Sequence, residues 1–177
     1  VWGDINVTLG SNGGSTATSF YTTYDNAGTS ETPVQVIKSG RVFGCNNLLG
    51  SPQGDVTVTV WRTVAGNGGT QVRTTAKVKA DNKAIMDVHP DDYETVPGYV
   101  TPTYEVAAVY GGGNLAPYEA AGKKAHVIIN GCDATSIQTV YGGGNAAAVP
   151  ETDVDINSCY EIGSVFGVGN GKDKYKK

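Results

Sequence analysis

Branched aliphatic residues occupy every second position in four short segments of the chain. A period of two is that of a β-strand with one buried face, so each segment is predicted to be a half-buried strand. We call these segments the A strands; they are residues 4–8, 55–59, 126–130 and 153–157.

A second motif alternates with the A strands along the chain. It is a hexapeptide with Val first, an aromatic residue second, Gly third and Asn last, and its four copies mark an internal repeat. We call these segments the B strands with their turns; they are residues 42–47, 109–114, 140–145 and 165–170. Each A strand and the B strand that follows it form one unit, so the chain contains four units.

The spacing of the units favours a β-solenoid. The first Val of the hexapeptide recurs after 31 residues between Val109 and Val140, and after 25 residues between Val140 and Val165. These steps lie in the range of stacked solenoid coils. The predicted fold is therefore all-β, a parallel β-helix-like β-solenoid of about four coils in which A strands pair with A strands and B with B. A β-sandwich made of antiparallel A–B hairpins is the alternative.

The first two units are lengthened by insertions between their A and B strands, at about residues 9–33 and 61–104. We predict a single domain over residues 1–177, a piece of a longer protein, with both insertions on a shared side. Within the second insertion, alternation on either side of Asp81 and Asn82 predicts a β-hairpin over residues 72–88. Long excursions in compact domains are usually functional or disordered. We expect this one to be ordered against the solenoid and to carry the ligand contact.

The Gly and Asn residues of the hexapeptide suit a sharp turn repeated on every layer, because both tolerate backbone conformations that β-branched residues avoid. In stacked layers the Asn residues would lie roughly 4.8 Å apart, and their amides would form a hydrogen-bonded ladder. The predicted ladder comprises Asn47, Asn114, Asn145 and Asn170, beside a stack of Phe43, Tyr110, Tyr141 and Phe166. A phosphate-binding loop is disfavoured, since the motif repeats and lacks the Lys-Ser/Thr ending of a P-loop.

The alternation of V-x-I strands with V-Y-G-G-G-N turns resembles repeat regions of large exported proteins from gut Bacteroidetes and some Firmicutes. That resemblance covers the four strands and four turns and leaves both insertions unmatched. It implies a surface or adhesion protein of parallel β-helix type, located extracellularly or at the cell surface, and it supplies no catalytic motif. The first unit departs from the pattern, with Cys45 and Asn46 in place of two Gly residues.

Charge and composition exclude several classes of function. The formal net charge is −4, and the dense basic cluster is the tail of Lys172, Lys174, Lys176 and Lys177, interpreted as a solvated end. A nucleic-acid partner is not expected, because phosphate binding needs a basic face. Membrane insertion is not expected either, since no stretch approaches the roughly 20 apolar residues of a spanning helix. The three Cys residues include no C-x-x-C pair, and neither a metal site nor a cofactor is predicted.

The candidate ligand-binding residues lie in the second insertion. The aromatic candidates are Tyr93, Tyr99 and Tyr104, which offer apolar ring faces and hydroxyl groups to sugars; the polar candidates are His89, Asp91 and Asp92. A metal site or an acid–base pair at the polar candidates competes with ordinary solvated turn chemistry, which is the favoured interpretation.

Two further features recur in the units. Asp4, Asp55 and Asp153 recur at the start of the A strands, where His126 interrupts them, and solubilising charge is favoured over a calcium-binding row. Cys132 and Cys159 are interpreted as small buried residues and not as a redox pair.

These patterns predict a non-enzymatic cell-surface or adhesin-type repeat module that binds a glycan or a host or matrix surface, or spaces another domain. The alternative is a carbohydrate-active β-helix enzyme, a polysaccharide lyase or hydrolase. Acidic or basic residues converging in a cleft along one sheet would favour the enzyme.

Overall fold

The computed structural model of the chain describes residues 2–10, 21–26, 35–63, 80, 82–99, 104–131 and 135–171. Nine strands and very little helix make up this part of the chain, and the strands form two sheets. The all-β class predicted from the alternation is thereby confirmed. The lysines of the tail, Cys132 and residues 72–79 lie outside the described residues.

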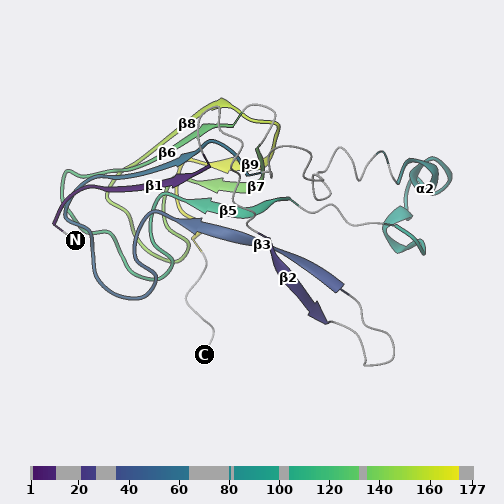
Figure 1. Ribbon diagram of the computed structural model, residues 1–177, viewed down its shortest axis with the longest axis horizontal. Coiled ribbons are helices and arrows are strands. Elements are labelled where there is room, and N and C mark those ends of the chain that lie inside the picture. The colour runs from purple at the N-terminus through teal and green to yellow at the C-terminus, as the bar shows by residue number, and fades with distance from the viewer. Residues whose placement is uncertain are drawn as a thin grey trace.

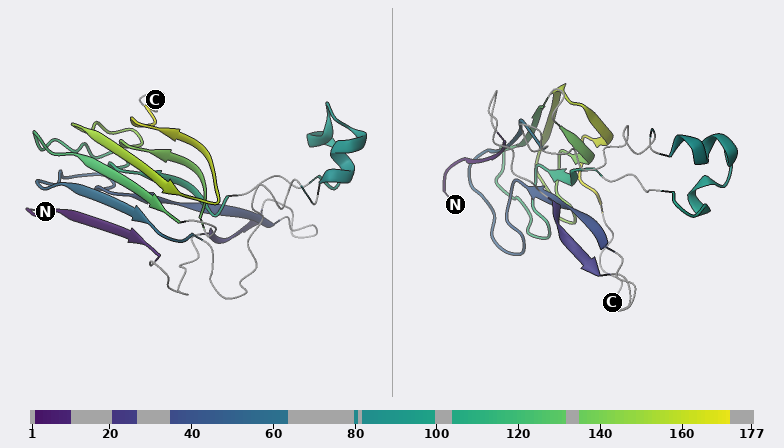
Figure 2. Two further views of the ribbon diagram at one scale, coloured as in Figure 1. Left: turned by 90° about the horizontal axis from the view of Figure 1, so that it is seen from above. Right: turned by 45° about the vertical axis from the view of Figure 1, so that its right-hand side comes forward.

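The first sheet contains all four A strands. They are β1 (Ile5–Leu9), β4 (Val56–Val60), β6 (Ala125–Asn130) and β8 (Thr152–Ser158), in the order β1-β4-β6-β8. Each pair of neighbours is parallel. Figure 2 shows these strands side by side along one face of the molecule.

The second sheet contains the B strands and one extra strand. Its members are β2 (Tyr21–Asn26), β3 (Gln35–Phe43), β5 (Val106–Tyr110), β7 (Ser136–Tyr141) and β9 (Glu161–Phe166), in the order β2-β3-β5-β7-β9. From β3 to β9 the neighbours are parallel. The predicted register is confirmed, because Val109 is level with Val42 and Val140, and Val165 is level with Val140. In the described residues, no A strand pairs with a B strand as the β-sandwich alternative required.

The hydrophobic core lies between the two sheets. Alternate residues of β4 and β6 are buried, which is the pattern of strands with one face inward. Val58 and Val127 of the first sheet belong to the same buried cluster as Val109 and Val140 of the second, and all four are fully buried. Removing this apolar surface from water is the main stabilising contribution to the fold.

The register of the A strands differs from the one that the repeats suggested. The predicted row placed Asp153 level with Asp55, but Asp153 lies level with His126 and Thr57. The shift between the second and third units is two residues. Because a shift of two keeps the same side chains facing inward, hydrophobic alternation alone cannot detect it.

The first insertion contains a strand that the sequence pattern did not reveal. Strand β2 pairs antiparallel with β3, whose N-terminal part extends well beyond the hexapeptide. The pair extends from the sheets at the lower right of Figure 1. It covers the outer edge of β3 at residues 35–39, and a covered edge is protected against pairing with another chain.

The predicted hairpin over residues 72–88 is wrong in its second half. Residues 83–88 form helix α2 (Lys83–Val88), followed by the 3-10 helix η1 (Tyr93–Thr95). Ala, Met and Lys in this segment favour helix, and Lys83 Nζ contacts Asp87 Oδ2 at 2.6 Å, one turn apart. Figures 1 and 2 show α2 standing away from both sheets, so this part of the insertion is not packed against them as expected.

Candidate functional site

The four Asn residues of the hexapeptide are joined by their side-chain amides. Each Nδ2 donates to the Oδ1 of the preceding unit, at distances of 2.8, 2.7 and 2.8 Å along the series Asn47, Asn114, Asn145 and Asn170. Two tyrosine hydroxyls add donors to this ladder, Tyr110 to Asn145 at 3.2 Å and Tyr141 to Asn170 at 3.1 Å. The amide groups are therefore engaged in holding the units together.

The aromatic residues of the hexapeptide form a parallel stack beside the Asn ladder. Ring centroids are 4.7 Å apart between Phe43 and Tyr110, 4.8 Å between Tyr110 and Tyr141, and 5.2 Å between Tyr141 and Phe166. Interplanar angles of 5°, 4° and 13° make each pair a stacked one. These distances follow the strand spacing and lie in the favourable range for aromatic pairs.

The candidate residues of the second insertion do not form one site. His89 Nδ1 lies 3.2 Å from Asp92 Oδ1 on the surface, and Asp91 beside them is exposed. The rings of Tyr93 and Tyr99 contact each other at 5.4 Å with a tilt of 47°.

Tyr104 is in a different place, at the start of the return to β5. Its hydroxyl lies 3.0 Å from the position that a Cβ would take on Gly163 of β9. Tyr104 therefore lies against the second sheet, while Tyr93 and Tyr99 lie on the protruding helical segment of residues 82–99 (Figure 1). The expected three-tyrosine platform reduces to the pair Tyr93 and Tyr99.

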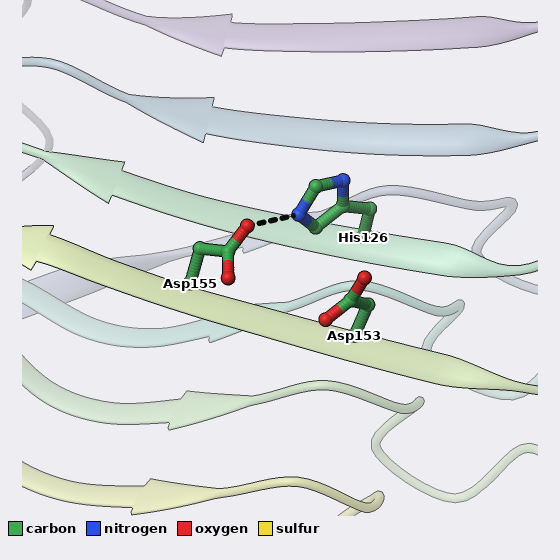
Figure 3. Close-up of side chains that lie close together, drawn as sticks. All are labelled: His126, Asp153 and Asp155. Atoms are coloured by element: carbon green, nitrogen blue, oxygen red, sulfur yellow. Dashed lines mark hydrogen bonds and ion pairs between the residues drawn. The ribbon is translucent and has the colours of Figure 1, made fainter.

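A charged cluster that the sequence patterns did not single out lies on the outer face of the first sheet. It consists of His126 on β6 with Asp153 and Asp155 on β8, and one ligand atom from each lies within 4.8 Å of the others. Figure 3 shows the three side chains in a triangle on the sheet face, with His126 Nε2 2.8 Å from Asp155 Oδ2. The sequence signal was present, since two Asp residues at positions i and i+2 of a strand share a face.

Two lysines form ion pairs with carboxylates in or beside this cluster. Lys124 Nζ contacts Asp153 Oδ2 at 2.9 Å, and Lys123 Nζ contacts Asp55 Oδ2 at 3.2 Å. The hydrogen bond from Lys124 lowers the pKa of Asp153, and Asp153 in turn raises the pKa of Lys124. The backbone N–H of Lys124 and the Lys123 ammonium lower the pKa of Asp55.

The geometry of this cluster suits cross-strand pairing better than catalysis or metal binding. A metal ion would have to displace the Lys124 ammonium from Asp153 and compete with the His126–Asp155 contact. Asp155 is exposed, and His126 and Asp153 are half-buried, on a sheet face. Catalytic groups gain most from a site that excludes water. The cluster thus contributes a cross-strand ion pair, Lys124 with Asp153, and a cross-strand contact between His126 and Asp155.

These pairs predict a dependence of stability on acidic pH. Because the folded-state pKa of Asp153 is lowered, its contribution is fully present above the ordinary carboxyl pKa and is lost as pH falls through the lowered value. Asp153→Asn should therefore lower the thermal midpoint at about pH 6, and the difference from the parent should shrink as the pH falls below the ordinary carboxyl pKa. Thermal unfolding followed by circular dichroism measures both midpoints. If the difference between the two thermal midpoints persists unchanged in acid, the charge of the Asp153 carboxylate does not stabilise the fold.

The described cysteines are free and partly buried. Burial raises the pKa of Cys45 to about 12 and also raises the pKa of Cys159, which packs against the core. Thiols with raised pKa values are poor nucleophiles, because the thiolate is the reactive form.

Comparison with known proteins gives no match to a family model, to a curated protein or to a solved structure. In the part of the chain that the structure describes, no helix is long and apolar enough to cross a membrane.

Proposed function

We propose that the chain is a non-enzymatic β-solenoid module of a surface or adhesin-type protein, and that it presents its insertions to a glycan or a host or matrix surface. The observation that supports this proposal is that the repeated residues contact one another from unit to unit. The Asn amides, the aromatic rings and the inward Val side chains each contact their counterparts in neighbouring units. Residues engaged in this way support a scaffold and leave binding to the inserted segments.

The protruding segment of residues 82–99 supplies the contact surface in this proposal. In Figure 1 this segment and β2 extend from the same end of the sheets. Tyr93 and Tyr99 are half-buried there and in mutual contact, which fixes their orientation. A sugar ring can lie against such aromatic faces while hydroxyl groups offer hydrogen bonds.

The enzyme alternative receives less support. It required charged residues converging in a cleft along one sheet, whereas the cluster at His126 lies on a sheet face, with Asp153 paired to Lys124 and Asp155 in contact with His126. A pocket of about 550 Å³ lies elsewhere, between residues 143–152 and the turn that contains Val168, Gly169 and Gly171. Small aliphatic residues and Gly backbone dominate its lining.

A glycan array with the purified chain tests the proposal. We expect binding to a restricted set of glycans, and a loss of at least about tenfold in affinity in the double variant Tyr93→Ala and Tyr99→Ala, since two aromatic contacts together contribute at least about 1.4 kcal/mol. Tyr160→Ala is the matched control, because Tyr160 is an exposed tyrosine next to β9, outside this segment.

Three outcomes would contradict the proposal in different ways. Equal loss in the Tyr160 variant would place binding on the sheets. Absence of binding to any glycan or matrix protein would leave a spacer role. Release of shortened saccharides, abolished by His126→Gln, would favour the enzyme.

A further inference from the structure

The last unit leaves part of the interior layer uncovered. Val165 and Phe166 of β9 are each 46% exposed, whereas Val140 and Tyr110, at the same positions of earlier units, are 0% and 3% exposed. Ile156 of β8 is likewise 39% exposed. Strands β8 and β9 are the edges of their sheets, and edge strands present backbone groups that can pair with another chain.

The hydrogen bonds between the turns form a regular series, and the last unit carries the next donor and the next acceptor of that series. In each earlier turn the N–H of the third hexapeptide residue donates to the aromatic carbonyl of the following unit. The donors Gly44, Gly111 and Gly142 reach Tyr110, Tyr141 and Phe166 at 2.9, 3.0 and 2.9 Å. The N–H of Gly167 is the next donor in this series. Asn145 Oδ1 accepts from both Tyr110 and Asn170, and Asn170 Oδ1, which accepts from Tyr141, is the corresponding acceptor for a following amide.

The glycine at position 167 indicates what would lie there. A Cβ on Gly44 or Gly111 would overlap the carbonyl oxygen of the following unit's glycine, and a Cβ on Gly142 would lie 2.6 Å from the oxygen of Gly167. Glycine is required at these positions by the backbone of the next unit. A Cβ on Gly167 would meet nothing within 4 Å, and its φ lies outside the left-handed region. The residue therefore has the shape needed for a further unit, although nothing in the described residues demands it.

We propose that the β8–β9 end is a docking site for a further unit of the same repeat. The occupant is a polypeptide segment with two short strands, one with alternating branched aliphatics and one ending in Val-aromatic-Gly-x-Gly-Asn. It adds in parallel to β8 and β9, covers Val165 and Phe166, and extends the Asn ladder from Asn170. Val168 at the fourth hexapeptide position is compatible with such docking, since Cys45 carries a side chain at that position beneath the second unit.

A second copy of the whole chain fits this end less well. Its β1 is an edge strand of the described sheet and could meet β8, but β2 covers residues 35–39 of its β3, so only residues 40–43 of that edge could meet β9. Because β2 runs antiparallel to β3, it cannot offer β9 the parallel partner that the repeat provides elsewhere. A single unit, which offers both of its strands along their full length, is therefore the occupant that we propose. This inference goes beyond the proposed function, because it concerns an end of the sheets that the insertions do not use.

Amide hydrogen exchange on the full chain tests the docking site. The probe is a peptide with the sequence of residues 146–170, the last unit itself, joined to the C-terminus of the full chain by a flexible Gly-Ser linker that gives a high effective concentration. We expect exchange of the amides in β8 and β9 to slow by at least about tenfold relative to the chain without the peptide. Gly167→Ala should remove this protection, because its Cβ would meet the backbone of the docked unit.

Gly3→Ala is the matched control, since a Cβ at Gly3 also meets nothing within 4 Å and lies near β1, at the opposite end of the first sheet. It should leave the protection intact, and unfolding of both variants without the peptide should match the parent. Unchanged exchange in β8 and β9 of the tethered chain would overturn the proposal. Equal protection in the Gly167 variant would do the same. Concentration-dependent protection of these amides in the chain without the peptide would overturn it in favour of a second copy.

Discussion

Gly111→Ala is expected to lower the free energy of unfolding by at least about 3 kcal/mol, because the space around residue 111 cannot hold the added methyl group. The added Cβ would overlap the carbonyl oxygen of Gly142 and lie 3.1 Å from Ala125 Cβ and Val127 Cγ2. These neighbours are backbone and fully buried side chains, so relief requires β5 and β7 to move apart within a close-packed interior. Urea unfolding followed by circular dichroism measures the change.

Gly167→Ala is the control for that experiment, since it makes the same change at the same hexapeptide position. A Cβ there meets nothing within 4 Å, so we expect a change within about 0.5 kcal/mol. Similar losses in the two variants would mean that glycine is needed for backbone conformation and not for the close approach of neighbouring units.

Asn145→Ala is expected to lower the free energy of unfolding by about 2–3 kcal/mol. The side chain is 7% exposed and takes part in three hydrogen bonds, with Asn114, Asn170 and the hydroxyl of Tyr110. Removing it leaves those partners without their bonds at partly or fully buried positions, which costs more than the net gain from making them. The midpoint of chemical denaturation, at unchanged slope, gives the loss directly.

Asn47→Ala is the matched control at the exposed end of the ladder. Its side chain accepts one bond, from Asn114 at 2.8 Å, and water can replace it. We expect a loss of about 0.5 kcal/mol. A loss below about 0.3 kcal/mol for Asn145→Ala would mean that the amide ladder contributes nothing to stability.

The B strands could be placed from the sequence because the hexapeptide leaves little freedom. Val, an aromatic residue, Gly and Asn at fixed positions define one register, and the pairing of Val109 with Val140 follows it. The A strands offered only alternation, which cannot distinguish registers that differ by two residues. Segment 83–88 is short, and its few aliphatic residues fit either period, so local helix propensity decided the outcome there.

The charged cluster shows why sites on a sheet are harder to infer than the sheet itself. His126 and Asp155 are far apart in the sequence and meet only because β6 and β8 are neighbours in one particular register. The predicted platform of three tyrosines was wrong for the opposite reason. Tyr99 and Tyr104 are close in sequence, yet Tyr104 lies beside β9 while Tyr99 contacts Tyr93.

Methyl–methyl nuclear Overhauser effects in a chain labelled at its valines test the parallel pairing of the units directly. Successive B strands paired in parallel and in register predict contacts from Val109 to Val42 and Val140, and from Val140 to Val165, with the A strands giving the separate series Val58, Val127 and Val154. Backbone contacts that instead pair each A strand antiparallel with the B strand of its own unit would contradict this parallel arrangement.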